Sequence, residues 1–280
     1  MPIHDQSYRR YGGGKAIPGR AWTVIARAGI MEMLRKRIFL AVLLAGWIPF
    51  VWYAIRLYLA VTYPQASSFL AVTPDTFRQF FSAQDFFVFV LTVYAGSGLI
   101  ANDRRANALQ IYLSKPLVRS EYIMGKAAVL LAFLLGVTLV PALLLLLLQV
   151  LFSGSVEFLR KNLFLIPAIT TASLLQSLLA TLTMLALSSF SKSARFVAIM
   201  YTGIMFFTLA MFGVLSAITG GTRLAWVALG ANLQQVTDVL FRQPPRYQTP
   251  WAVSLIVILA LIALSISVLE RRVRGVEVVT

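Results

Sequence analysis

Residues 124–152, MGKAAVLLAFLLGVTLVPALLLLLLQVLF, contain one charged side chain, Lys126. A helix of about 20 apolar residues crosses the roughly 30 Å hydrocarbon core of a bilayer, so this stretch is long enough to span a membrane. The 280-residue chain has a mean hydropathy of +0.80 and 12% charged residues, too few for a soluble domain of that size. Five further apolar runs occupy about residues 38–61, 84–101, 164–189, 196–219 and 251–269. The sequence predicts an all-α polytopic membrane protein with six transmembrane helices.

The positions of Lys and Arg predict how the chain is oriented. Of the 25 basic residues, 18 fall in the segment before the first run, the 2–3 loop, the 4–5 loop and the C-terminal tail. Basic residues are retained on the cytoplasmic side, so both termini are expected there. We expect a flexible cytoplasmic tail at 1–19, a single six-span transmembrane domain at 20–270 and a cytoplasmic C-terminal tail at 271–280. The net charge of +15 is attributed to topology and anionic lipid headgroups and not to nucleic-acid binding.

Two segments outside the apolar runs show helical periodicity. Between Arg20 and Arg37, apolar residues recur at three- and four-residue spacing, which predicts an amphipathic interfacial helix or a cytoplasmic extension of the first span. These residues are Trp22, Ile25, Ala26, Ile30 and Met33.

In LAWVALGANLQQVTDVLFRQ, residues 224–243, an apolar stripe is interrupted by polar residues. This predicts an outer amphipathic or re-entrant segment between spans 5 and 6. The stripe consists of Leu229, Leu233, Val236 and Leu240, and the interruptions are Asn232, Gln234, Gln235 and Asp238.

The loop between spans 2 and 3 is charged and favours a helix. Asn102 is a candidate N-cap, and Asp103 would lie in the first turn, near the positive end of the helix dipole. The helix is expected to end near Pro116, where proline disfavours its continuation. Its apolar face would consist of Leu109, Tyr112 and Leu113, with Arg104 and Arg105 at its head.

The order of residues in this loop resembles the 2–3 loop of the ABC-type-2 permeases, the six-helix membrane subunits of ATP-driven exporters. The six spans, the N-terminal amphipathic helix and the outer helical segment also match that family's layout. One departure is Asn107-Ala108, where many members carry Gly-Thr. The residues that carry the resemblance are Asp103, Arg104, Arg105, Ala108, Leu109, Ser114, Lys115, Pro116, Leu117, Arg119, Ser120, Glu121, Tyr122, Gly125 and Lys126.

The resemblance implies a cytoplasmic coupling helix that docks into a groove of an ABC ATPase subunit, the nucleotide-binding protein. It also implies a second permease copy, as a homodimer or a related heterodimer, in a bacterial cytoplasmic (inner) membrane. The chain has no Gly-x-x-x-x-Gly-Lys-[Ser/Thr] phosphate loop, so ATP and Mg are expected on the partner ATPase and no cofactor on this chain. The expected docking residues are Asp103, Arg104, Arg105, Leu109, Tyr112, Leu113 and Lys115.

Catalysis by the chain itself is not expected. Its only histidine is His4, it has no cysteine, and it contains neither a His-Glu-x-x-His nor a Gly-x-Ser-x-Gly motif. No metal site is therefore predicted, and the chain is expected to be the non-catalytic subunit of a transporter.

Polar residues inside the apolar runs are candidates for a transport pathway. Arg56 in span 1 lines a path for an anionic substrate or extends to the outer headgroups. In span 4, hydroxyl residues recur at helical spacing beside Gln176, and they line a path or join helices by packing. These span 4 candidates are Thr170, Ser173, Gln176, Ser177 and Thr181.

Three functions remain open from the sequence. The leading one is the permease subunit of an ATP-binding cassette exporter. The alternatives are a membrane scaffold or signalling subunit that anchors a soluble partner, and a secondary transporter. The last requires a buried acidic residue in the membrane, for which Asp85, expected at the start of span 2, is a poor candidate.

Overall fold

A computed structural model describes residues 21–63, 73–108, 119–153 and 157–273, and every element in these ranges is helical. The first half contains α1 (Ala21–Leu34), α2 (Arg37–Ala45), α3 (Ile48–Thr62), α5 (Pro74–Leu91), the π-helix η2 (Thr92–Gly96), α6 (Gly98–Arg105) and α8 (Arg119–Val137). The second half contains α9 (Leu139–Ser153), α10 (Glu157–Lys161), α11 (Leu165–Ser188), α12 (Ala194–Thr219), the 3-10 turn η3 (Ala225–Val227), α13 (Leu229–Leu240) and α14 (Trp251–Arg272).

Six helical runs in the described residues are long and apolar enough to cross a membrane: Arg37–Thr62, Pro74–Arg105, Arg119–Ser153, Leu165–Ser188, Ala194–Thr219 and Trp251–Arg272. The predicted all-helical chain with six such helices is confirmed at this level. They indicate a multi-pass membrane protein.

The second helical run begins ten residues before the expected start at residue 84. Pro74 occupies the first turn, Asp75 follows it, and the backbone N–H of Thr73 donates to Oγ1 of Thr76 at 3.2 Å. These are strong helix-start signals. The polar side chains of this first stretch lower its hydropathy, which is why the apolar pattern alone placed the start too late. As a result Asp85 lies within the helix and not at its beginning.

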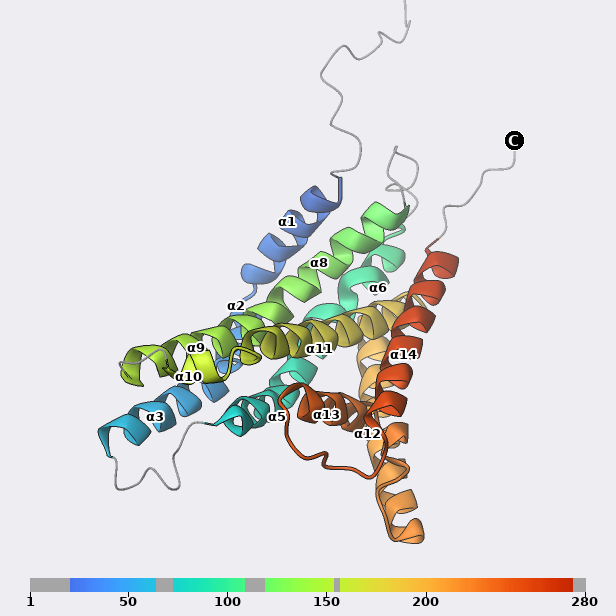
Figure 1. Cartoon of the computed structure of the whole chain (residues 1–280). Helices are drawn as coiled ribbons and strands as arrows, with labels where there is room; N and C mark the ends of the chain where they lie inside the picture. The colour runs from blue at the N-terminus through green and yellow to red at the C-terminus, as the bar shows by residue number, and fades with distance from the viewer. Residues whose placement is uncertain (1–20, 64–72, 109–118, 154–156, 274–280) are drawn as a thin grey trace, which may run out of the picture.

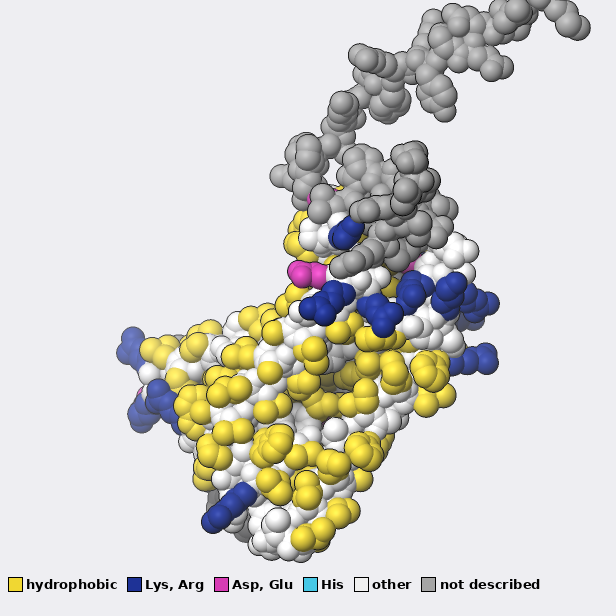
Figure 2. All heavy atoms as spheres, turned by 90° about the vertical axis from the view of Figure 1, so that its right-hand side faces the viewer, with side chains coloured by type: hydrophobic (Ala, Val, Ile, Leu, Met, Phe, Trp, Pro, Cys, Tyr) yellow, Lys and Arg dark blue, Asp and Glu magenta, His cyan; other side chains and the backbone are white. Residues whose placement is uncertain are grey.

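The described helices diverge from one end of the molecule toward the other. In Figure 1, α3 and α9 run to the lower left, α12 runs to the lower right, and α13 lies between them. The opposite end holds the first turn of α1, the last turn of α6, the α11–α12 turn and the last turn of α14. Lys and Arg side chains gather near that end in Figure 2, and we call it the basic end.

The main core lies toward the basic end, where α8 is the central helix. Val129, Leu130 and Leu134 of α8 are fully buried and belong to one cluster with Leu91 and Met184. A second, aromatic-rich cluster joins α3, α5, α9 and α11 near Phe80. These clusters hold α5 and α11 in fixed positions, and both helices contribute to the site described below.

Helix α1 packs along the first turns of α8. A Cβ atom added to Gly125 of α8 would lie 2.8 Å from side-chain atoms of Ile25 and 3.0 Å from the carbonyl oxygen of Trp22, so glycine permits this close approach. Ile25 and Ile30, which belong to the predicted apolar face, pack against the main core. The location of α1 at a lipid surface stays a prediction.

Helix α13 is engaged on its polar face as well as its apolar stripe. Gln235 Nε2 donates to the carbonyl oxygens of Tyr247 and Thr249, and Asn232 Nδ2 donates to that of Trp226. Leu233 packs against α14 residues in a small apolar cluster. The segment after α13 therefore folds back over its polar side chains, which a simple amphipathic pattern with a solvated polar face does not anticipate.

Candidate functional site: an interhelical cavity and a charged corner

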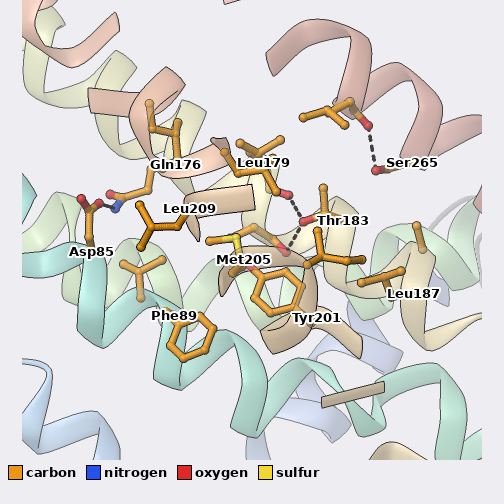
Figure 3. A pocket seen from close by; sticks show the side chains of 18 of the residues that line it. Asp85, Phe89, Gln176, Leu179, Thr183, Leu187, Tyr201, Met205, Leu209 and Ser265 are labelled. Carbon is orange, nitrogen blue, oxygen red and sulfur yellow. Dashed lines mark hydrogen bonds between the residues drawn. The ribbon is translucent and has the colours of Figure 1, made fainter. Parts of the chain in front are cut away.

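A cavity of about 500 Å³ lies between α5, α11, α12, α13 and α14. Figure 3 shows Asp85 and Gln176 at one end of it and Leu187 and Ser265 at the other. Its lining residues are Asp85, Val88, Phe89, Gln176, Leu179, Ala180, Thr183, Ala186, Leu187, Phe190, Tyr201, Ile204, Met205, Leu209, Leu229, Gly230, Ala231, Leu233, Gln234, Tyr247, Leu261, Leu264, Ser265 and Val268.

Three helices and the segment before α14 build the polar end of the cavity. Gln176 Nε2 of α11 donates to Oδ1 of Asp85 at 2.7 Å, and Gln234 Nε2 of α13 donates to Oδ2 at 3.1 Å. The Tyr247 hydroxyl donates to Oε1 of Gln234 at 2.8 Å. The two amides hold the carboxylate from opposite helices, so its position is determined by α11 and α13 together.

Apart from this polar end, the cavity wall is effectively apolar, because its hydroxyl groups are already hydrogen-bonded. The hydroxyl of Thr183 donates to the carbonyl oxygen of Leu179 at 2.6 Å, and that of Ser265 donates to Leu261 at 2.7 Å. Each is thus satisfied by its own helix and presents little unmet hydrogen-bonding capacity. Among the residues that line the cavity, Asp85 is the one Asp or Glu, and there is no Lys or Arg. The cavity is therefore amphipathic, with one carboxylate at one end.

The cavity is bounded by helices that present apolar side chains at the surface. Leu209 of α12 and Leu264 of α14 line the cavity and are also exposed, at 56% and 60%. Figure 2 shows a hollow surrounded by apolar side chains on this face of the molecule. A smaller recess of about 230 Å³ shares Asp85, Phe89 and Leu209 with the main cavity.

A buried cluster of ion pairs lies next to the polar end of the cavity. The fully buried carboxylate of Asp238 in α13 lies 3.3 Å from Nη1 of Arg78 and 3.0 Å from Nε of Arg246. Arg246 also donates from its backbone N–H to Asp238 and from Nη2 to the hydroxyl of Ser82. These contacts fix the residue next to Tyr247. Burial raises the pKa of the Tyr247 phenol above its ordinary value, although the positive charge of Arg246 opposes the shift.

Arg56 of α3 contacts α5, a helix that contributes to the cavity, but Arg56 itself does not line the cavity. Its Nη1 donates to Oε1 of Gln79 at 3.1 Å, and Gln79 Nε2 donates to Asp75 at 2.6 Å. Arg56 is thus linked through Gln79 to the carboxylate of Asp75 on α5. Its candidate role as a pathway-lining residue finds no support in the described cavity.

The span 4 candidates separate into two groups. Gln176 lines the cavity, whereas Ser173, Ser177 and Thr181 are fully buried and are not among its lining residues. Thr170 is partly exposed and donates to the carbonyl oxygen of Ile166. Positions 176, 179, 180, 183 and 187 share the cavity face of α11, while the small hydroxyl residues fall on a face buried among other helices. This arrangement favours the packing interpretation.

A charged corner lies at the basic end, where the expected coupling helix begins. Asp103 Oδ2 lies 2.7 Å from Lys126 Nζ and accepts the Tyr122 hydroxyl at 2.7 Å, and Arg104 donates to the carbonyl oxygen of Ser189. We call the residues Asp103, Arg104, Tyr122, Lys126 and Ser189 the corner. It joins α6, α8 and the α11–α12 turn.

The expected helix start at Asn102 is wrong. Asn102 lies inside α6, which ends at Arg105, and Asn107 has a φ of 53°, in the left-handed region. The helical hydrogen bonds of the preceding span continue through Asn102, so no cap is needed there. Asp103 and Arg104 face partners within the chain, while Arg105 is exposed. Leu109, Tyr112, Leu113 and Lys115 lie outside the described residues.

The pattern of residues missed three contributors to the polar end: Asp85, Gln234 and Tyr247. Gln234 was identified only as an interruption of an apolar stripe, and Asp85 was placed at a span end. The Thr73-Pro74-Asp75-Thr76 capping signal would have corrected the position of Asp85. Tyr247 reaches the site through a folded-back segment that has no periodicity from which its position follows.

No protein-family model matches the chain, and no curated protein matches it in sequence. Among the described residues, no group of three or more His, Cys, Asp or Glu side chains is placed to hold a metal ion. The two features available for function are therefore the amphipathic cavity and the corner.

Proposed function

We propose that the chain is the permease subunit of an ATP-binding cassette exporter. A separate ABC ATPase subunit, carrying ATP and Mg, hydrolyses the nucleotide, and a second permease copy completes the pathway. The observation that carries the proposal is the cavity of about 500 Å³ among helices long enough to span a membrane. Cavities of roughly 300–1,000 Å³ are typical of small-molecule sites.

One continuous helical run links this cavity to the corner. Asp85 lines the cavity and Asp103 lies eighteen positions later in the run Pro74–Arg105, a distance of roughly 27 Å along a helix. Helix α11 makes a parallel connection, because Gln176 lines the cavity and Ser189, just after α11, accepts from Arg104. Force applied near the corner is therefore transmitted to two walls of the cavity.

The run contains a site suited to bending. The π-helix η2, Thr92–Gly96, lies between Asp85 and Asp103, and π-helical turns often occur at functional positions. In the proposed mechanism, ATP binding changes the contacts of the ATPase with the loop that follows α6. The corner then shifts α5 and α11 against α12 and α14, which opens or closes the cavity.

A secondary transporter is the second candidate, and a specific observation favours it. Asp85 places a carboxylate inside a membrane-length helix, where acidic residues often serve ion or proton sites. A scaffold or signalling subunit has less support, because anchoring a soluble partner through the corner requires no interhelical cavity.

The test is purification of the tagged chain from its native membranes in mild detergent, with mass spectrometry of what accompanies it. The permease proposal predicts an ATPase with a Walker motif at about one copy per chain. Its absence, under conditions that keep other membrane complexes intact, would favour the secondary transporter.

An Arg105→Glu variant is expected to weaken the association of the chain with the ATPase. Lys161→Glu, exposed at the opposite end, serves as the charge-matched control.

A further inference from the structure

We infer that the cavity binds an amphipathic organic monocation, an amine or quaternary ammonium with an apolar tail. The inference begins with charge. The cavity wall carries the carboxylate of Asp85 and no Lys or Arg. The nearby guanidinium of Arg246 is held by Asp238 and Ser82. Asp85 therefore has no ion-pair partner in the described chain, and a charge in a low-dielectric site favours an opposite charge beside it.

The carboxylate retains capacity for a ligand. Each oxygen of Asp85 accepts one amide hydrogen bond, from Gln176 or Gln234. A carboxylate offers about four acceptor positions in total, so further donors or a cation can approach. Because the amides come from two different helices, they orient the carboxylate without neutralising it.

The shape of the cavity indicates the remainder of the ligand. Beyond Asp85 the wall continues through Phe89, Leu179 and Met205 toward Leu187, as Figure 3 shows. Phe89 lies one helical turn from Asp85, and its ring stacks with that of Tyr201 at 6.1 Å between centroids. Aromatic rings next to a carboxylate suit an organic cation, since a ring face attracts positive charge. The long apolar remainder suits an alkyl or aryl tail.

The route of access also favours an amphipathic molecule. The rim residues Leu209 and Leu264 belong to α12 and α14, whose outer surfaces are apolar. The hollow in Figure 2 opens between such side chains. A ligand that is already dissolved in the bilayer can therefore enter sideways, with its tail in the apolar part and its cation beside Asp85.

The inference rests on the proposed function for the transport step, but binding is a property of this chain alone. The test measures calorimetric binding of decyltrimethylammonium, decanol and decyl sulfate to the chain in nanodiscs, with empty nanodiscs as the reference for lipid partitioning. We expect decyltrimethylammonium to bind at least tenfold more tightly than the other two. Equal binding of the cation and the alcohol to the wild-type chain would overturn the inference.

Two variants locate the site. Asp85→Asn keeps a side chain that fits between the two glutamines, and we expect it to abolish the preference for the cation. Glu157→Gln removes an exposed carboxylate elsewhere and should leave the preference unchanged. Ser265→Leu narrows the apolar end, so it should weaken binding of the ten-carbon cation more than that of a four-carbon analogue. Unchanged binding in both Asp85→Asn and Ser265→Leu would place the ligand elsewhere and contradict the inference.

This experiment separates the two proposals. Absence of a cation preference in the wild-type chain, with an ATPase still co-purifying, would reject the ligand class and retain the permease. Selective cation binding without any ATPase partner would retain the ligand class and support the secondary transporter.

Discussion

The carboxylate of Asp103, in the last turn of α6, lies 2.7 Å from Nζ of Lys126 in α8, and less than a fifth of either side chain is exposed. The same oxygen accepts the Tyr122 hydroxyl. The contact therefore joins the last turn of α6 to α8. Its two residues lie in the helices that flank the loop that we propose engages an ATPase.

Lys126→Met should destabilise the protein by removing the cation beside a mostly buried carboxylate. Charged hydrogen bonds of this kind contribute about 1.5–3 kcal/mol, so we expect a loss in that range in the free energy of unfolding. Lys36→Met is the control, because Lys36 pairs with Glu32 at an exposed position where such pairs contribute about 0–1 kcal/mol. Unfolding in mixed micelles measures both, and equal small losses would show that the corner is not held by this pair.

Asp238→Asn should be more damaging, because it leaves two arginines without their shared carboxylate. Asp238 is fully buried and contacts both Arg78 and Arg246. Breaking a buried ion cluster in this way costs about 3–5 kcal/mol. The melting temperature in detergent should fall strongly, whereas Glu157→Gln, which breaks an exposed pair with Lys161, should leave it nearly unchanged. A small effect of Asp238→Asn would mean that the cluster does not support the polar end.

Gly125→Ala tests the packing of α1 on α8. The added methyl group would lie 2.8 Å from Ile25, and overpacking of this kind costs about 1–3 kcal/mol. Gly136→Ala, in the same helix, meets no atom within 4 Å and should be neutral or stabilising by roughly 0.5–1 kcal/mol.

The readout for this pair of variants is maleimide labelling of Ala26→Cys, since the chain has no cysteine of its own and Ala26 is buried in α1. Faster labelling in Gly125→Ala and unchanged labelling in Gly136→Ala are expected. Equal labelling in both would show that α1 accommodates the added methyl group without moving away from α8.

Tyr247 should make the stability of the protein depend on alkaline pH. Burial raises the pKa of its phenol in the folded state above the value in the unfolded chain. The folded protein then keeps a proton that the unfolded chain loses, so the stabilisation is fully present below about pH 10 and decreases as pH rises through the folded pKa. Tyr247→Phe should lose less stability than the wild type between pH 9 and pH 11. Parallel losses in the two proteins would exclude this contribution.

Hydropathy was sufficient to predict six membrane-length helices, because long apolar runs depend on composition alone. It failed at the start of the second helix, where Asp75, Arg78 and Gln79 make the first turns polar. Those side chains are accommodated by hydrogen bonds with one another and with Arg56, a tertiary arrangement that a sliding average does not detect.

The candidate site was only partly predictable for the same reason. Gln176, one of the pathway candidates, lines the described cavity, whereas its neighbours in the hydroxyl stripe face the protein interior. Helical spacing predicts which residues share a face, whereas the identity of the facing helix decides what that face does. Asp85 and Gln234 come together because α13 packs against α5, and Tyr247 joins them because the segment after α13 folds back. No local sequence pattern specifies either contact.

The most direct test of the central claim, that nucleotide at a partner ATPase changes the cavity, is alkylation of Ser265→Cys in membranes that contain the assembled complex. The account predicts a several-fold change in alkylation rate on addition of ATP and Mg, with no change at Leu44→Cys, an exposed position on α2 outside the cavity. Equal rates at Ser265→Cys with and without ATP would contradict the claim.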